Sequence, residues 1–187
     1  MGIGIQICGL NGCGKSTVGK ALARELGFHF IDNENLYFQR TAENEPYRNE
    51  RPRPEVERLL MEEVHRHENF VFAAVKGDYG AAIQPLYDYV VYLQVPGDMR
   101  AWRVRNRSFL RFGERMLPGG DLHEKEEAFF QVVAGRKEEL VENWLNSLSC
   151  PVLRLDGRMP VEENVKRIME WLEKNAFVNL EAERRDE

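Results

Sequence analysis

The chain has 187 residues, of which 43% are hydrophobic and 30% are charged, and its formal net charge is −5. This length suits a single domain with its own core, and the negative balance excludes attraction to nucleic acid through the charge of the whole molecule. The three cysteines, Cys8, Cys13 and Cys150, show neither a disulfide framework nor zinc-ligand spacing, so we expect a reducing, cytoplasmic setting. No signal peptide and no membrane span are expected, because the first residues lead directly into a strand-like run and no apolar stretch approaches about 20 residues.

Short apolar runs along the chain predict five β-strands, at residues 3–8, 28–31, 70–75, 89–95 and 151–155. Apolar residues at helical spacing predict helices between them, at Lys15–Leu26 and at about residues 98–112, 124–148 and 161–174. Residues 32–67 are mostly polar and helical, with interruptions at three prolines. Nearly continuous apolar strands that alternate with helices indicate a parallel sheet covered on both faces.

The first strand is followed directly by a glycine-rich loop that satisfies the pattern G-x-x-x-x-G-K-[ST]. Its glycines let the backbone curl so that successive N–H groups point at phosphate oxygens. Lys15 adds a charge for the β- and γ-phosphates, and the Ser16 hydroxyl is a ligand for magnesium. Because the loop lies between an apolar strand and an amphipathic helix, we predict a site for ATP and Mg²⁺ rather than a chance turn. The predicted nucleotide-binding residues are Gly9, Asn11, Gly12, Cys13, Gly14, Lys15, Ser16 and Thr17.

Arginines recur at helical intervals on one face of residues 98–112. Arg100, Arg103, Arg107 and Arg111 fall within an arc of roughly 80°, while Arg105 faces elsewhere. This face carries no acidic partners, so something anionic is expected to compensate it. Arginines that close over a transferring phosphoryl group stabilise its charge and exclude water, although nucleic acid could neutralise the same stripe.

In their order, these motifs resemble the nucleoside monophosphate kinase and shikimate kinase group of P-loop kinases, from Gly4 to about Leu172. The resemblance is carried by the phosphate loop, residues 27–34 and 89–96, the arginine-rich segment and residues 153–157. It implies a three-layer α/β sandwich around a five-stranded parallel sheet of order 2-3-1-4-5. It also implies one kinase domain at residues 1–175, with an acceptor-binding insertion at about 33–68 and a lid at about 108–122, before a charged tail at 176–187.

The resemblance assigns two acids that follow the second strand. In shikimate-type kinases a D-x-D stands there, whose first acid helps to hold magnesium and whose second contacts the acceptor. Asp32 and Glu34 occupy these places, with Glu for the second Asp. Asp32 is a candidate for magnesium binding, for the acceptor and for catalysis, and the alternative for it is an N-cap of the next helix.

Further roles follow from the same resemblance. Arg107 and Arg111 fit the lid arginines, one of which often stacks on adenine in these kinases. Arg136 resembles the arginine that returns from the lid to the phosphates or the acceptor. Asp156, with Gly157, resembles the loop that borders adenine, and an ordinary turn is the alternative for that pair.

The acceptor side departs from both branches of the group. Residues 76–80 read Lys-Gly-Asp-Tyr-Gly, which matches neither pattern, and no Walker-B carboxylate is evident. Lys76 and Asp78 suit a polar or phosphorylated acceptor, although a surface ion pair gives the same sequence. Arg40 lies in the segment that binds acceptor in the related kinases. The four histidines show no constellation and are assigned no chemistry.

We therefore predict an ATP-dependent kinase that transfers the γ-phosphoryl group of Mg-ATP to a small-molecule acceptor, either a nucleotide or a shikimate-like metabolite. Lys15, Asp32, Arg107, Arg111 and Arg136 are the expected catalytic residues. The alternatives are a polynucleotide 5′-hydroxyl kinase, which would bind nucleic acid through the arginines, and an ATP-hydrolysing switch without an acceptor.

Overall fold

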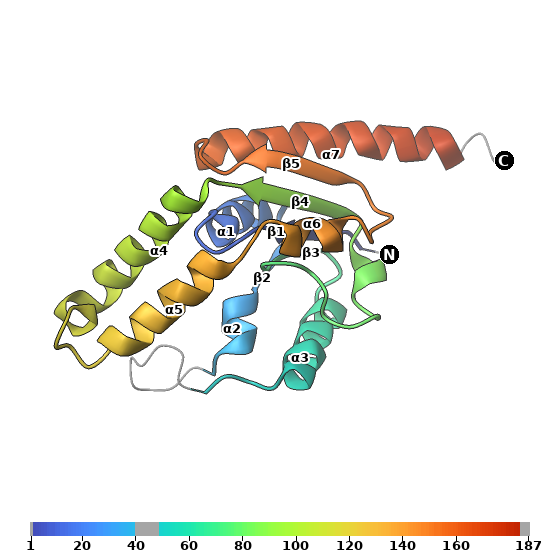
Figure 1. The fold of residues 1–187 in the computed structure, drawn as a ribbon. Coiled ribbons are helices and arrows are strands. Elements are labelled where there is room, and N and C mark those ends of the chain that lie inside the picture. The colour runs from blue at the N-terminus through green and yellow to red at the C-terminus, as the bar shows by residue number, and fades with distance from the viewer. Residues whose placement is uncertain (1, 40–48, 184–187) are drawn as a thin grey trace.

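A five-stranded parallel sheet forms the middle layer of the computed structural model, which describes residues 2–39 and 49–183 (Figure 1). Its strands lie in the order β2-β3-β1-β4-β5. This result confirms the predicted fold class and strand order. The strands are β1 (Gly4–Cys8), β2 (His29–Asp32), β3 (Phe70–Ala73), β4 (Tyr89–Gln94) and β5 (Val152–Asp156).

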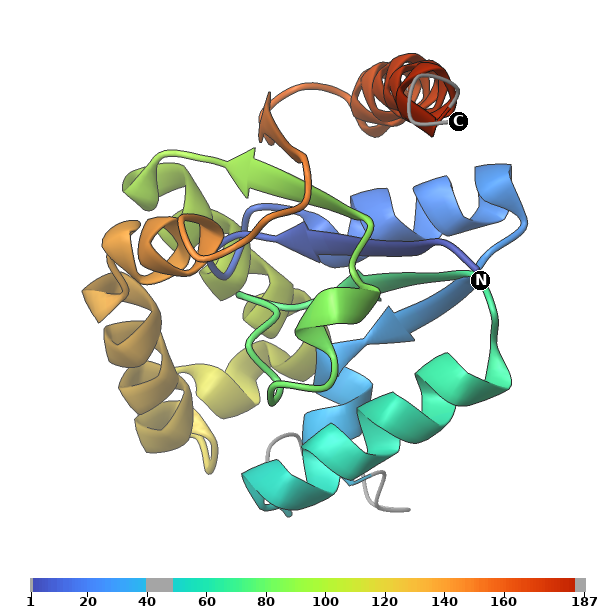
Figure 2. The same cartoon turned by 90° about the vertical axis from the view of Figure 1, so that its right-hand side faces the viewer.

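Helices cover both faces of the sheet. One face carries α1 (Lys15–Leu26) and α7 (Val161–Glu183), and the other carries α3 (Arg53–Arg66) and α6 (Glu139–Leu145). Figure 2 shows α1 and α3 on opposite sides of the sheet. The remaining elements are the short α2 (Asn33–Tyr37), α4 (Gly97–Phe112), α5 (His123–Gly135) and two 3₁₀ turns, η1 (Gln84–Leu86) and η2 (Gly113–Met116).

Each strand contributes side chains to two hydrophobic cores, one on each face of the sheet, because successive side chains of a strand point to opposite faces. On β4, Val90 and Tyr92 join the core under α3 and α6, whereas Val91 and Leu93 join the core under α1 and α7. All four side chains are at most 1% exposed. The uninterrupted apolar strands in the sequence are therefore explained by burial on both faces.

The single helix expected at residues 124–148 is wrong, because two helices occupy this stretch. Helix α5 ends at Gly135, the backbone of Arg136 is extended, and α6 begins at Glu139. The break redirects the chain, so that Trp144 and Leu145 reach the core on the sheet. Two further bounds differ from expectation by more than one residue: β3 ends at Ala73, and α7 continues past residue 174 to Glu183.

Helices α4 and α5 form a hairpin that projects from one end of the sheet, with η2 at its tip (Figure 1). A third, smaller core holds the hairpin together, and it contains Val104, Phe112, Met116, Leu122, Phe130 and Val133. The segment at about residues 108–122, for which a lid was predicted, forms the tip of this hairpin, and its role as a lid stays a prediction. Within the described part of the chain, every helix is too short or too polar to cross a membrane.

We expect Leu60→Ala to lower the free energy of unfolding by about 2–5 kcal/mol, because Leu60 of α3 is fully buried and its loss leaves a cavity. Leu110→Ala is the matched control, since Leu110 is 79% exposed, and it should change stability by less than about 0.5 kcal/mol. Urea denaturation followed by circular dichroism measures both. Equal losses in the two variants would contradict this packing of α3.

Candidate phosphate-binding site

The loop between β1 and α1 depends on glycines in the left-handed region of backbone conformation. Gly9, Gly12 and Gly14 have φ angles of 141°, 83° and 98°. A Cβ atom on Gly12 would lie 2.5 Å from the carbonyl oxygen of Arg100. Gly12 is therefore required twice, for its backbone conformation and for the close approach of α4.

The loop turns its donors inward at the start of α1. Gly14 is the N-cap residue and supplies no capping side chain, so no side chain caps the first N–H groups of α1, whereas the N–H groups of Thr17 and Val18 donate to the carbonyl oxygen of Gly14. The Lys15 ammonium group folds back over the loop, where its Nζ donates to the carbonyl oxygen of Leu10 at 3.3 Å. Backbone dipoles and one cation therefore converge, as anion binding at a helix N-terminus requires.

A cavity of about 330 Å³ opens beside these donors. It is bounded by the loop, by α4 and by the turn after β5, so three segments far apart in sequence share it. The volume lies at the lower end of the range for ligand pockets, about 300–1,000 Å³. The lining residues are Gly12, Cys13, Gly14, Lys15, Ser16, Thr17, Val18, Arg103, Val104, Arg107, Gly157, Met159 and Val161.

The arginine stripe on α4 divides into structural and exposed members. Arg100 is 7% exposed and donates from Nε to the carbonyl oxygen of Val95 at 3.1 Å. Arg103 donates from Nη1 to the carbonyl oxygen of Gly157 at 3.0 Å. Arg100 and Arg103 therefore donate to backbone carbonyl oxygens. The sequence had led us to expect an anion as their partner.

Two other arginines of the stripe remain at the surface. Arg107 is exposed and lines the cavity, and Arg111, also exposed, lies with its guanidinium 5.1 Å from the ring centroid of Phe112. Arg105 faces away, as expected, and pairs with Glu127 at 2.7 Å. The structure thus places Arg107 against the cavity.

The turn after β5 forms one wall through its backbone. Arg158 donates to the Asp156 carboxylate, and this pair lowers the pKa of Asp156 to about 2. A Cβ atom on Gly157 would lie 2.6 Å from the carbonyl oxygen of Cys13, so only glycine allows this turn to touch the phosphate loop. Met159 also lines the cavity. The sequence did not indicate this residue, because its nearness to Asp156 and Gly157 was the only signal for it.

Asp32 acts as an N-cap, the alternative that the sequence left open for it. Its Oδ1 accepts a hydrogen bond from the backbone N–H of Glu34 at 3.0 Å. The Asp32 side chain is half-buried at the C-terminal end of β2, and Glu34 is exposed. Through the register of the sheet, Asp32 pairs with Ala73, which in turn pairs with Ile7 just before the phosphate loop. Asp32 therefore lies at the same edge of the sheet as the loop.

Arg136 connects the phosphate loop with the far side of the site. Its Nη1 donates to Oδ1 of Asn11 in the loop. A hydrogen bond to Glu50 raises the pKa of Tyr37, and burial raises that of Tyr79; the positive charge of Arg136 opposes both shifts. The guanidinium of Arg136 is thus within electrostatic reach of both phenols, neither of which the sequence had indicated.

Lys76 and Asp78 form the ion pair that the sequence left open, with 2.7 Å between Nζ and Oδ2. Arg53 joins them, because its Nη2 lies 3.8 Å from the same carboxylate oxygen and also donates to the carbonyl oxygen of Asp78. Arg53 lies over Tyr79 as well, 5.8 Å from its ring centroid. Charged and aromatic groups therefore gather in the segment that follows β3. The other residue predicted here, Arg40, lies outside the described residues.

Comparison with known proteins gives a family and a set of relatives. Residues 5–109 match the model of a family described as the AAA domain. The chain is 32% identical over 179 residues to the uncharacterised protein YqaC of Bacillus subtilis (strain 168), covering 91% of this chain and 98% of that protein. It is 34% identical over 125 residues to a cytidylate kinase of Ignicoccus hospitalis, covering 60% of this chain and 69% of the relative.

Solved structures share the fold at lower identity. A gluconokinase from Sinorhizobium meliloti 1021 superposes with a TM-score of 0.58 at 17% identity, covering 95% of this chain and 97% of the other. A shikimate kinase from Bacteroides thetaiotaomicron gives a TM-score of 0.55 at 22% identity, covering 91% and 98%. At these identities the likeness shows the fold.

We expect Gly12→Ala to weaken Mg-ATP binding at least about tenfold, because a Cβ atom at this left-handed position meets the carbonyl oxygen of Arg100. Gly135→Ala is the matched control, since no atom lies within 4 Å of a Cβ atom there. Isothermal titration calorimetry measures both affinities, and circular dichroism confirms that both variants are folded. Unchanged affinity in folded Gly12→Ala would refute the assigned loop geometry.

Proposed function

The chain belongs to the AAA-domain family, within the group of small P-loop kinases that includes nucleoside monophosphate and shikimate kinases, and on this premise we propose that it transfers the γ-phosphoryl group of Mg-ATP to a small-molecule acceptor. One observation carries the proposal. The phosphate loop and Arg107 line a common cavity, and Arg136 donates to Asn11 of the same loop. Phosphoryl transfer needs positive charge around the transferring phosphoryl group, and Lys15, Arg107 and Arg136 would supply it.

In this proposal the phosphate loop binds the triphosphate. The backbone N–H groups at the start of α1 donate to phosphate oxygens, and Lys15 moves from the carbonyl oxygen of Leu10 to the β- and γ-phosphates. Gly157 presents backbone to the nucleotide, since the side chain of the neighbouring Asp156 is held by Arg158. We assign Asp156 to the nucleotide site through its backbone.

The oxygen ligands that Mg²⁺ prefers are present at this edge of the sheet. The Ser16 hydroxyl lies on the cavity, and the Asp32 carboxylate lies at the end of β2, separated from β1 by one strand. We propose that Ser16 holds the ion directly and that Asp32 orients its water shell. When bound, the ion would neutralise charge on the phosphate oxygens.

The acceptor is proposed to lie between the end of β2 and residues 76–79. Arg136 would orient the transferring group, because its contact with Asn11 keeps its charge at the loop. Lys76 and Asp78 would bind polar groups of the acceptor once their mutual ion pair opens. Glu34 is exposed beside the Asp32 turn and is proposed to contact the same molecule.

A small acceptor is favoured over a polynucleotide. A polynucleotide site would need free cations along α4, but Arg100 and Arg103 donate to backbone carbonyls and Arg105 pairs with Glu127. These arginines shape the protein and are not available to a phosphate backbone.

We expect Arg107→Ala to lower turnover roughly 10²-fold, with little change in the free energy of unfolding, because Arg107 faces the cavity without a described partner. Arg105→Ala is the matched control, because Arg105 lies two residues before Arg107 on α4 but pairs with Glu127 at the surface, and this variant should retain wild-type turnover. Steady-state kinetics and urea denaturation separate the two effects. Equal losses of turnover and stability in Arg107→Ala would make this residue structural.

A screen of pooled metabolites, nucleotides and oligonucleotides for acceptor-dependent ADP release tests the function. We expect a small molecule to stimulate ADP release by the wild-type chain but not by Lys15→Ala. Lys20→Ala, which removes an exposed ammonium group from the same helix, should behave as wild type. Stimulation only by oligonucleotides would instead favour the polynucleotide kinase, and equal ADP release with and without every pool would favour an ATPase switch.

A further inference from the structure

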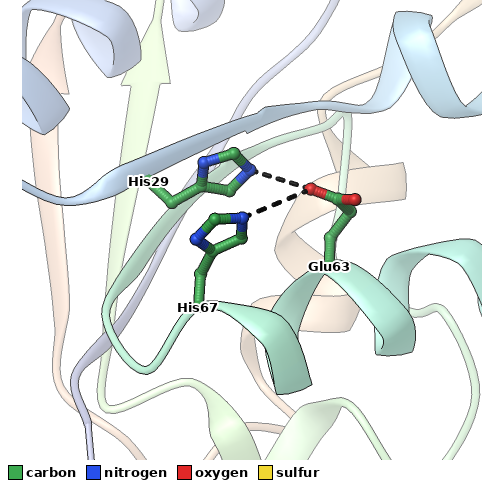
Figure 3. A group of neighbouring side chains, drawn as sticks. All are labelled: His29, Glu63 and His67. Atoms are coloured by element: carbon green, nitrogen blue, oxygen red, sulfur yellow. Dashed lines mark hydrogen bonds and ion pairs between the residues drawn. The ribbon is translucent and has the colours of Figure 1, made fainter.

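Two histidines and a glutamate meet at the end of the sheet opposite the phosphate loop (Figure 3). His29 is distant in the sequence from Glu63 and His67, which are four residues apart. His29 begins β2, Glu63 lies in the last turn of α3, and His67 is the C-cap of that helix. The sheet brings them together. His29 pairs with Phe70, and a short turn leads from His67 to Phe70, so both imidazoles project from the same corner.

We propose that His29, Glu63 and His67 form a binding site for a divalent transition-metal ion such as Zn²⁺. The two imidazole rings are stacked, with 3.6 Å between centroids and 11° between planes. Both Nε2 atoms face one carboxylate oxygen of Glu63, at 2.9 Å for His29 and 3.9 Å for His67. All candidate ligand atoms lie within 4.8 Å of one another.

These spacings suit a zinc ion. Ligand bonds of about 2.0–2.2 Å at tetrahedral angles place neighbouring ligand atoms about 3.3–3.5 Å apart. The two observed separations lie on either side of that value, so small rotations of the side chains suffice. The rotations include the two rings, because the lone pairs of stacked imidazoles are nearly parallel and must converge on the ion.

The environment permits both the rotation and the entry of an ion. The side chains of His29, Glu63 and His67 are 33%, 26% and 36% exposed. The second carboxylate oxygen of Glu63 pairs with Arg66, which fixes the orientation of the carboxylate in the way that outer partners hold metal ligands. Three protein ligands would leave the remaining coordination positions to water.

A cation also accounts for the arrangement better than a hydrogen bond does. One proton between His29 and Glu63 satisfies a single imidazole, and the Nε2 of His67 is too far from the carboxylate for a hydrogen bond. An ion between the three groups would engage both imidazoles and the carboxylate. It would also clamp the start of β2 to the end of α3.

The test uses the full chain without an affinity tag, stripped of metal by a chelator that is then removed, and without nucleotide. We expect calorimetry to show one Zn²⁺ bound per chain. Mutation of a residue that only supports a metal ligand typically lowers metal affinity about 10–100-fold. Loss of a ligand itself, in His67→Ala or in the isosteric Glu63→Gln, should therefore lower the Zn²⁺ affinity at least about 10-fold. His65→Ala, which removes an exposed histidine from the same helix, should bind as wild type.

Cobalt distinguishes this site from cysteine binding, because Cys150 is partly exposed. Co²⁺ at the proposed site should give visible absorption without the near-ultraviolet bands of thiolate ligation, and Zn²⁺ should raise the Tm of the wild type but not of Glu63→Gln. No saturable binding, thiolate bands, or equal affinity in Glu63→Gln, His67→Ala and His65→Ala would each overturn the proposal. Because no readout involves turnover, the result is independent of the proposed kinase activity.

Discussion

The candidate site depends on close contact between the phosphate loop and two neighbouring backbones. A Cβ atom on Gly12 would meet the carbonyl oxygen of Arg100, and one on Gly157 would meet that of Cys13. Side chains at these two positions would separate the loop from α4 and from the turn after β5. Because both are glycines, three segments enclose one cavity, and the donors at the start of α1 face into it. The fixed geometry places the dipoles before a ligand arrives, so little reorganisation opposes binding.

The arginines of α4 show how one periodic pattern serves two purposes. Arg103 donates to the carbonyl oxygens of Gly12 in the loop and Gly157 in the turn after β5. Arg100 donates to the carbonyl oxygen of Val95, and Arg107 lines the cavity. These hydrogen bonds keep α4 against the loop, so the exposed Arg107 projects from a helix that is held in place. The α4–α5 hairpin has its own small core. Its tip contains the segment at about residues 108–122 for which the resemblance implies a lid.

Much of the fold was predictable because burial on both faces leaves a strong sequence signal. The strands and the phosphate loop were located from apolar runs and glycine spacing, while the strand order came from the resemblance. The break at Arg136 was missed, since Gly135 is tolerated in helices and no proline marks the turn. The helical spacing of the arginines predicted the face of α4 on which Arg100 lies, but it could not predict that the Arg100 side chain is buried. His29 and His67 were missed because only the β2–β3 register brings them together.

The central claim, that the loop between β1 and α1 binds a triphosphate, is tested most directly by amide NMR of the ¹⁵N-labelled chain titrated with a non-hydrolysable Mg-ATP analogue. The account predicts that the largest, saturable shifts occur at the amides of residues 12–17, followed by residues 157–161, with little change around His29 at the opposite end of β2. Saturable shifts that leave residues 12–17 unchanged, or no shifts at all in the folded protein, would contradict it.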